Sequence, residues 1–254
     1  MLHFEVESVL SHPGLKEVHT YSFTENLNLL EVESIDMSTA TALQSISLFL
    51  PKLRSLQLPE DAPISIVCID CSSLEKLPDF TKMSKLEQLY FYKSKMTSFD
   101  CSCLRPHTQQ FFLSFTKCHN LTQLDSLDTL TQLRSLQLYK TSLSVLDVSG
   151  CEKLDSLVLF KCQELSQIKG LQSIKESLRY LRCCSIDKLT GINCSGCDIN
   201  KLEIQHINAD KEHSPKAFSI EDGFSLDVSG FTRLRTINII ECPHFNKVIG
   251  LEDN

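Results

Sequence analysis

A short apolar frame recurs along this chain, and it constrains the fold more than any other feature. The frame reads Leu-x-x-Leu-x-Leu, and a weaker first copy starts near Leu15 and Val18. The central residues of the later copies are Ile46, Ile66, Leu89, Leu113, Leu136, Leu157, Leu181, Leu202 and Ile237. These centres are 20 to 24 residues apart, apart from a last step of 35 residues. Such a period is the sequence signature of a solenoid.

A second motif recurs at a nearly fixed distance before the frame. Leu146-Asp147-Val148-Ser149-Gly150 starts 11 residues before Leu157. Similar runs start at Ile35, Ile192 and Leu226, 10 or 11 residues before their own centres. Because two motifs keep the same phase, we expect the far side of each coil to be patterned as well, with long and short coils partly alternating.

The apolar alternation predicts a short strand with one buried face in every coil. Stacking the coils in parallel would bury a continuous core and pair the backbone edges. We therefore predict an α/β-type leucine-rich-repeat solenoid, with a curved parallel β-sheet on the concave face and a mostly irregular or short-helical convex side. Residues 1–254 would form a single domain of about nine to ten coils, with an insertion near 207–223. Neither end looks capped, so we expect the chain to be part of a longer protein or a truncated relative of one.

Charge and hydropathy exclude several classes of partner. The formal net charge is −7, which leaves no basic footprint for nucleic acid or an anionic membrane. The N-terminus does not read as a signal peptide, and no apolar run is long enough to span a bilayer. We expect a cytoplasmic protein with a protein partner, and with neither nucleic acid nor membrane as its ligand.

Twelve cysteines raise the question of a metal or disulfide framework. Cys68-x-x-Cys71 and Cys194-x-x-Cys197 have zinc-ligand spacing, but 122 residues separate the two pairs, too many for one site of the usual kind. The repeat register explains ten cysteines as packing residues instead: Cys68, Cys71, Cys101, Cys118, Cys151, Cys162, Cys183, Cys194, Cys197 and Cys242. We predict no metal and no cofactor, and regularly buried thiols suit a reducing cytosol.

No sequence pattern indicates catalysis. His206, Asp210, Glu212 and His213 lie together in the insertion, where a solvated loop is the favoured interpretation over a weak metal site. None of the common catalytic motifs is present. We therefore predict that the protein is not an enzyme.

The amino-acid sequences of three repeats resemble those of a known family. Cys162-x-x-Leu165-x-x-Ile168-x-Gly170-Leu171 is similar to the C-terminal repeats of plant intracellular disease-resistance receptors, which combine Toll/interleukin-receptor, nucleotide-binding and leucine-rich-repeat domains. Cys242-Pro243-His244-Phe245-x-x-Val248-x-Gly250-Leu251 and Cys71-Ser72-Ser73-Leu74-Glu75-Lys76-Leu77-Pro78 share this likeness. The resemblance implies the ligand-sensing part of an innate immune receptor. No phosphate-binding Gly-x-x-x-x-Gly-Lys-Ser/Thr run is present, so the family's ATPase and NADase activities do not carry over.

Residues between the buried leucines should point outward onto the concave face. Four of the five tyrosines fall on these positions, and exposed aromatic residues and arginine are typical of interfaces. The predicted partner-binding residues are Phe49, Ile69, Tyr90, Tyr92, Gln137, Tyr139, Val158, Phe160, Tyr180 and Arg182. Strand propensity alone is the other explanation for these aromatics.

Two hypotheses for function remain open at this point. The first is a plant-type receptor module whose partner is a pathogen effector or another domain of the same receptor. The second is a free-standing leucine-rich-repeat scaffold or adaptor, or a bacterial effector or surface repeat protein, because the Asp-Val-Ser-Gly-Cys run at 147–151 also resembles bacterial surface repeats.

Overall fold

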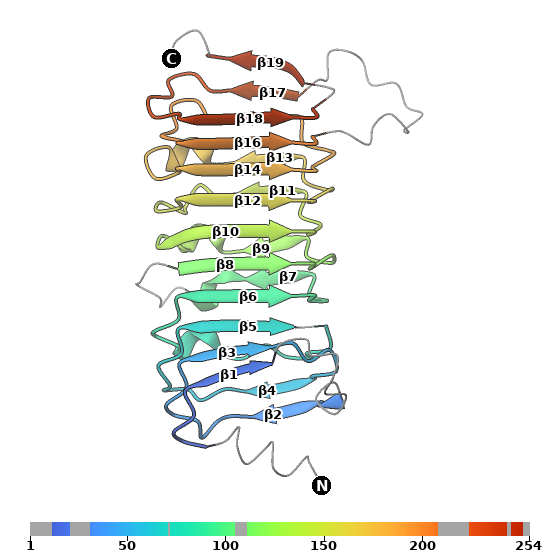
Figure 1. Ribbon diagram of the computed structural model, residues 1–254, viewed down its shortest axis with the longest axis vertical. Coiled ribbons are helices and arrows are strands. Elements are labelled where there is room, and N and C mark those ends of the chain that lie inside the picture. The colour runs from blue at the N-terminus through green and yellow to red at the C-terminus, as the bar shows by residue number, and fades with distance from the viewer. Residues whose placement is uncertain are drawn as a thin grey trace.

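Ten parallel strands form one continuous sheet along the length of the molecule, which we call the main sheet (Figure 1). The computed structural model describes residues 12–20, 31–70, 72–104, 111–207, 224–242 and 245–250. The sheet order is β1-β3-β5-β6-β8-β10-β12-β14-β16-β18. The strands are β1 (Glu17–Thr20), β3 (Ser45–Leu48), β5 (Ile66–Asp70), β6 (Gln88–Tyr92), β8 (Phe111–Thr116), β10 (Leu133–Tyr139), β12 (Ser156–Phe160), β14 (Tyr180–Cys184), β16 (Lys201–Gln205) and β18 (Thr236–Ile240). The predicted parallel solenoid is confirmed.

The predicted strand centres lie opposite one another across the main sheet. Leu136, for example, pairs with Leu113 on one side and with Leu157 on the other. The same register aligns the centres Val18, Ile46, Leu89, Leu181, Leu202 and Ile237 with their neighbours. All of them except Ile237 are buried, so the repeat spacing read from the sequence is the spacing of the coils.

The coil around β5 differs from the prediction by one residue. Val67, not Ile66, pairs with Ile46 and Leu89. Val67 and Ile69 therefore point into the core, where both side chains are fully buried. The prediction that Ile69 lies on the outer face is wrong.

The cause of this error lies in the sequence of β5. Residues 66 to 69 are all apolar, so alternation alone fits two opposite frames. Ile64 is buried three residues before Val67, at the place that Leu86 occupies before Leu89. The frame in this coil is therefore Ile64-x-x-Val67-x-Ile69, shifted by one residue toward the C-terminus from the predicted frame.

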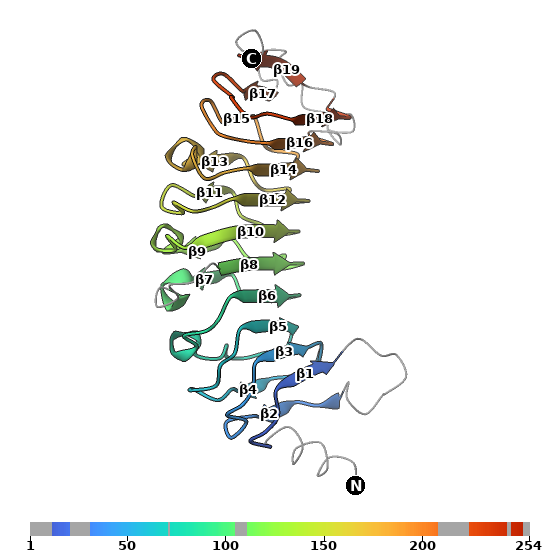
Figure 2. The same cartoon turned by 60° about the vertical axis from the view of Figure 1, so that its left-hand side comes forward.

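Short strands run along the other side of the coils, which we call the second side (Figure 2). They form separate small sheets: β2 (Ser34–Asp36) with β4 (Ser55–Gln57), β7 (Ser98–Asp100) with β9 (Gln123–Asp125), β11 (Val145–Asp147) with β13 (Gln167–Lys169), and β15 (Gly191–Asn193) with β17 (Phe224–Asp227) and β19 (Phe245–Ile249). In the described part of the chain, four complete 3-10 helices lie between strands: η2 (Phe80–Lys82), η3 (Cys101–Leu104), η4 (Leu127–Thr129) and η5 (Leu171–Ile174). The short helices were expected, whereas the paired strands were not. No helix of the described residues is long and apolar enough to cross a membrane.

The second sequence motif forms the corner that follows these short strands. A carboxylate or amide oxygen at the end of the strand accepts a hydrogen bond from the backbone N–H two residues on. The five pairs, 2.8 to 3.2 Å long, are Asp36 with Ser38, Asp100 with Ser102, Asp147 with Ser149, Asn193 with Ser195, and Asp227 with Ser229. The Ser38 and Ser102 hydrogen bonds hold the pKa values of Asp36 and Asp100 below the usual range. The motif therefore turns the chain from the second side back toward the core.

Between the two sides, the buried apolar side chains form one cluster that extends from Val18 to Phe231. Its most aromatic part surrounds Phe91, which is 1% exposed. The ring centroid of Phe91 lies 6.0 Å from that of Phe80 and 5.1 Å from those of Phe99 and Phe115. These rings come from four different elements, so they connect adjacent coils.

Glycine allows neighbouring coils to approach closely on the second side. Gly170 has a φ of 80° and packs against Ser149 of the preceding coil. A Cβ at Gly170 would lie 2.3 Å from the backbone nitrogen of Ser149. Gly250 has the same relation to Ser229, with 2.2 Å from its Cβ position to the Ser229 Cα. The Ile-x-Gly-Leu coil thus stacks directly on the Asp-x-Ser-Gly coil before it.

Candidate recognition face of the main sheet

The solvent side of the main sheet, which we call the main face, carries three columns of side chains. The columns arise because successive side chains of a strand point to opposite faces, so that alternate residues of neighbouring strands line up on one side. The third column, nearest the carboxyl ends of the strands, runs Asp70, Tyr92, Thr116, Tyr139, Phe160, Cys184, Gln205 and Ile240. Phe49 follows directly after β3 and continues this column.

Nine of the ten predicted binding residues lie on the main face. Gln137 is exposed, and the other eight are half-buried: Phe49, Tyr90, Tyr92, Tyr139, Val158, Phe160, Tyr180 and Arg182. Ile69 is the exception, because it is a core residue. Its place in the third column is taken by Asp70, which is 3% exposed.

The aromatic rings of the third column form two contacting pairs, with Thr116 between them. Tyr139 and Phe160, on the neighbouring strands β10 and β12, have ring centroids 5.1 Å apart. Phe49 and Tyr92 meet edge to face at 5.8 Å, across the coil in which Asp70 supplies no ring. Such contacts fix the rings in place, so they form a preorganised apolar strip.

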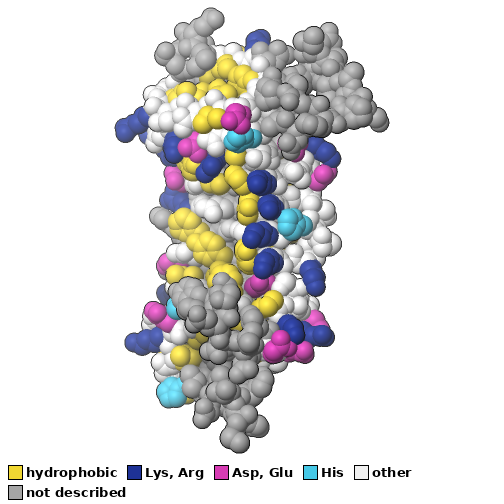
Figure 3. All heavy atoms as spheres, turned by 45° about the vertical axis from the view of Figure 1, so that its right-hand side comes forward, with side chains coloured by type: hydrophobic (Ala, Val, Ile, Leu, Met, Phe, Trp, Pro, Cys, Tyr) yellow, Lys and Arg dark blue, Asp and Glu magenta, His cyan; other side chains and the backbone are white. Residues whose placement is uncertain are grey.

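A row of lysines borders this strip. Lys93, Lys117, Lys140 and Lys161, which we call the lysine row, each follow the last residue of β6, β8, β10 and β12. All four have left-handed backbone, with φ between 52° and 57°. Their backbone N–H groups donate to the carbonyl at the end of the next strand at 2.7 to 2.9 Å. Figure 3 shows cationic side chains following one another along the long axis beside a strip of hydrophobic side chains.

The ammonium groups of the lysine row lie over the rings of the third column. The Nζ atoms of Lys93 and Lys117 are 5.1 and 5.0 Å from the Tyr92 ring centroid. Lys140 stands 5.5 Å from the Tyr139 ring, and Lys161 stands at the same distance from the Phe160 ring. Lys117 Nζ also donates a hydrogen bond to the Tyr92 hydroxyl at 2.7 Å. Cation–π contacts of this kind contribute about 0.5–1 kcal/mol at exposed sites and hold both partners in place.

Sequence reasoning missed the lysine row. The predicted binding residues extended no further than the third outward position of each strand, and each of these lysines is the residue directly after that position. The signal was present as four successive pairs: Tyr92-Lys93, Thr116-Lys117, Tyr139-Lys140 and Phe160-Lys161.

Toward the C-terminal end, the main face carries a network of ion pairs around Glu203. Lys201 Nζ and the Tyr180 hydroxyl donate to its carboxylate at 2.7 and 2.8 Å, and Arg182 Nε lies 3.4 Å away. The hydrogen bond from Lys201 holds the pKa of Glu203 below its usual range, although partial burial opposes this. Burial, together with Glu203, raises the pKa of Tyr180. The network fixes Tyr180 and Arg182 on the face.

We expect Glu203→Gln to lower the free energy of unfolding at pH 7 by about 1–3 kcal/mol, because an amide accepts charged hydrogen bonds less well. Since the folded pKa of Glu203 is depressed, its stabilisation is present above the unfolded value, near pH 4.3, and is lost as the pH falls through the folded value. Melting temperatures of both proteins measured from pH 7 to pH 3 should therefore converge at low pH. Glu152→Gln, at an exposed position, is the matched control, and a gap that stays constant with pH would contradict the assignment.

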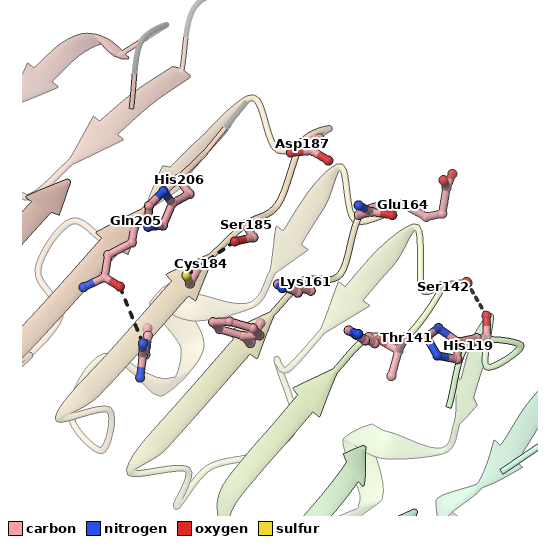
Figure 4. Close-up of a pocket in the computed structure, with 14 residues that line it drawn as sticks. His119, Thr141, Ser142, Lys161, Glu164, Cys184, Ser185, Asp187, Gln205 and His206 are labelled. Carbon is pink, nitrogen blue, oxygen red and sulfur yellow. Dashed lines mark hydrogen bonds between the residues drawn. The ribbon is translucent and has the colours of Figure 1, made fainter. Parts of the chain in front are cut away.

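A groove of about 860 Å³ opens where the lysine row ends. Phe160, Cys184 and Gln205 contribute main-face side chains to it, and Lys140 and Lys161 contribute the last two members of the row. Figure 4 shows Lys161, Cys184 and Gln205 projecting from neighbouring strands toward the same side. The groove exists because Cys184 is smaller than the ring that precedes it in the column.

The cysteines are free thiols in the described residues, and eight of the eleven are buried. Cys118, Cys162 and Cys242 follow strands of the main sheet by two residues, and their Sγ atoms lie 3.4 to 3.9 Å from carbonyl oxygens of their own and the preceding strand. Burial raises the pKa of the Cys118 thiol to about 11. These thiols act as packing residues with weak hydrogen bonds. The predictions that Cys68 and Cys242 are buried are wrong, because both are half-buried and Cys68 lies on the main face. Cys71 lies outside the described residues.

The side chains of the main face are suited to noncovalent binding of another molecule. In the described part of the chain, no three His, Cys, Asp or Glu side chains are grouped so that they could hold a metal ion. Residues 208–223 of the predicted insertion, with Asp210, Glu212 and His213, lie outside the described residues. His206 is described, and its Nδ1 is 2.9 Å from the Glu241 carboxylate.

No family model matches the chain, and a search of curated proteins gives no match. The assignment of function therefore depends on the chemistry of the main face.

Proposed function

We propose that this protein is a recognition module of the leucine-rich-repeat type that binds a protein partner across its main face. The supporting observation is the third column, where the rings form two contacting pairs, Phe49 with Tyr92 and Tyr139 with Phe160. Lysine ammonium groups lie over three of these rings, those of Tyr92, Tyr139 and Phe160. Interfaces favour rigid aromatic side chains because they bury large areas at a low cost in conformational entropy. In this repeat type, the main face is the concave side of the solenoid.

The proposed biological setting is the ligand-sensing portion of a plant-type intracellular immune receptor in the cytoplasm. Two observations support this setting. The repeats have a family-like sequence, as in Ile168-x-Gly170-Leu171, and the buried free thiols suit a reducing compartment. The partner would then be a pathogen effector or another domain of the same receptor. A nucleotide-binding domain encoded upstream of Met1 in the same reading frame is the expected result of sequencing that region.

A second candidate is a free-standing scaffold, adaptor or bacterial repeat protein. The observation that favours it is the Asp-x-Ser-Gly corner, which resembles bacterial surface repeats and recurs with the same turn at Asp147 and Asp227. An upstream region without any nucleotide-binding domain would favour this candidate over the receptor. Both candidates share the binding face.

The triple variant Tyr92→Ala, Tyr139→Ala and Phe160→Ala tests the face itself. Peptides selected from a random twelve-residue phage library on the immobilised wild-type protein serve as the probe. We expect the triple variant to bind the selected peptides at least tenfold more weakly, because about 1.4 kcal/mol corresponds to a factor of ten and these rings are the proposed anchors. Its melting temperature should fall by only a few degrees, because the three rings are half-buried.

A matched variant on the second side controls for loss of bulk surface. Val145→Ala, Gln167→Ala and Lys169→Ala replace three exposed residues of β11 and β13 and should leave peptide binding within about twofold of wild type. Selected peptides that bind both triple variants equally well would overturn the main face as the recognition surface.

A further inference from the structure

We propose that the main face binds an extended acidic segment of its partner, with the carboxylates of the segment placed along the lysine row. This inference rests on the proposed function and names the chemistry of the partner. Its starting point is that Lys93, Lys117, Lys140 and Lys161 occupy the same place in four successive coils.

The charges of the lysine row are poorly balanced within the protein. Lys93 Nζ lies 3.9 Å from the buried Asp70 carboxylate, and farther along the face Glu203 pairs with Lys201 and Arg182. The ion pairs among the described residues do not include Lys117, Lys140 or Lys161. On a chain with a net charge of −7, this local positive strip is complementary to an acidic ligand.

Backbone geometry does not account for these lysines. Left-handed backbone is unfavourable for residues other than glycine, and asparagine or aspartate tolerates that conformation better than lysine does. The equivalent corners of later coils carry Ser185, His206 and Glu241, so the fold does not require lysine there. The four lysines thus keep a left-handed backbone where other residue types would be less strained, which is typical of functional residues.

The spacing of the row fits an extended peptide. Adjacent strands of a sheet lie about 4.8 Å apart, so the row spans roughly 14 Å from Lys93 to Lys161. Side chains on one face of an extended peptide repeat every ~6.7 Å, so three at alternate positions cover roughly 13 Å. Three carboxylates at alternate positions would therefore match the length of the row, with the ammonium groups already held over the rings of Tyr92, Tyr139 and Phe160.

The groove beyond Lys161 gives the segment a defined end. Arg182 lines it together with Lys140 and Lys161, and Phe160 provides an apolar wall. Glu164 and Asp187 also line it, and Glu164 is paired with Lys188, so the carboxylate of the segment would bind on the side of Arg182. Arg182 Nη2 donates to Gln205 Oε1 at 3.5 Å, a long contact that a carboxylate would replace (Figure 4). A bulky side chain next to the last carboxylate would fit here.

An acidic peptide is favoured over a nucleic acid strand by the state of the rings. Proteins that bind single-stranded nucleic acid use open aromatic faces on which the bases stack. Here cations lie 5.0 to 5.5 Å from the centroids of Tyr92, Tyr139 and Phe160, so ring faces that a base would need are occupied. The overall negative charge also opposes a long polyanion more than it opposes a short acidic segment.

The test uses a fluorescein-labelled nine-residue peptide with glutamate at alternate positions and serine between them, titrated with the full chain at low salt. We expect the anisotropy to report binding that weakens as salt is added, because the contacts are ionic. The variant Lys117→Gln, Lys140→Gln and Lys161→Gln should bind at least tenfold more weakly. Lys82→Gln, Lys85→Gln and Lys153→Gln remove the same charge from exposed positions elsewhere and should stay within about twofold of wild type.

A second variant, Lys117→Asn, Lys140→Asn and Lys161→Asn, is a control for loss of folding, because asparagine tolerates left-handed backbone. It should melt no lower than wild type and still lose the acidic peptide. Equal losses in the row variant and its charge-matched control would overturn the proposal, and so would tighter, row-dependent binding of a nine-nucleotide oligothymidine. If the acidic peptide fails to bind while library peptides still require Tyr92, Tyr139 and Phe160, this inference falls and the proposed function stands.

Discussion

Phe91→Ala is expected to lower the free energy of unfolding by about 3–5 kcal/mol, the usual range for removing a buried phenylalanine ring. Phe91 is 1% exposed and lies within 6.0 Å, centroid to centroid, of three other rings. Those rings come from η2, β7 and β8, so they cannot collapse into the cavity without moving three coils. Denaturant unfolding followed by far-UV circular dichroism measures the loss.

Phe112→Ala is the matched control for this variant. Phe112 lies on the neighbouring strand β8 but faces outward and is 37% exposed. Its truncation should cost about 1–2 kcal/mol, clearly less than Phe91→Ala, because the ring is only partly buried and its removal leaves no enclosed cavity. Similar losses for the two variants would mean that the aromatic cluster is not the centre of the core. A broadened transition in Phe91→Ala alone would indicate that the coils on either side unfold separately, as expected of a stack held by nearest-neighbour contacts.

Gly170→Ala should destabilise the protein by roughly 2–5 kcal/mol, the sum of two separate costs. An alanine at a φ of 80° costs about 1–2 kcal/mol, because its Cβ clashes with its own backbone. The same Cβ would lie 2.3 Å from the Ser149 backbone nitrogen, and moving the coils apart to relieve that overlap costs about 1–3 kcal/mol more.

Gly196→Ala separates the two costs. Gly196 has a φ of 67°, but a Cβ there would meet no atom within 4 Å. We expect this variant to lose only the conformational part, about 1–2 kcal/mol. Equal melting temperatures for the two variants would mean that the coils do not pack against each other at Gly170. The pair therefore measures the contact between the two motif types directly.

Much of the fold could be predicted from the sequence because the coils are short and identical in phase. Leu89, Leu113 and Leu136 are separated by nearly constant steps, and a parallel stack places such residues opposite one another. The prediction failed where local pattern was ambiguous, at Ile66 and Ile69, because a run of four apolar residues has no preferred face. Only the preceding Ile64 distinguishes the two frames.

The candidate site was predictable in part. Outward positions such as Tyr92 and Tyr139 follow from alternation once the frame is known. The lysine row is visible in the sequence as residues that directly follow these outward positions, but its geometry is not. It depends on a left-handed corner, and these corners carry lysine where glycine would have indicated such a corner. The small sheets of the second side were missed for a related reason. Strands of three residues, such as β11, are too short for their periodicity to be recognised.

The two sides of the solenoid differ in continuity, which has a mechanical consequence. The ten strands of the main sheet are joined by hydrogen bonds from end to end, whereas the second-side strands of the described residues are bonded in groups of two or three. Under bending, the main sheet should behave as the nearly inextensible layer, and strain should gather at the junctions between the groups. Two consecutive coils, such as those of β11 and β13, would then be the elastic unit of the molecule and a natural length for adding or deleting sequence.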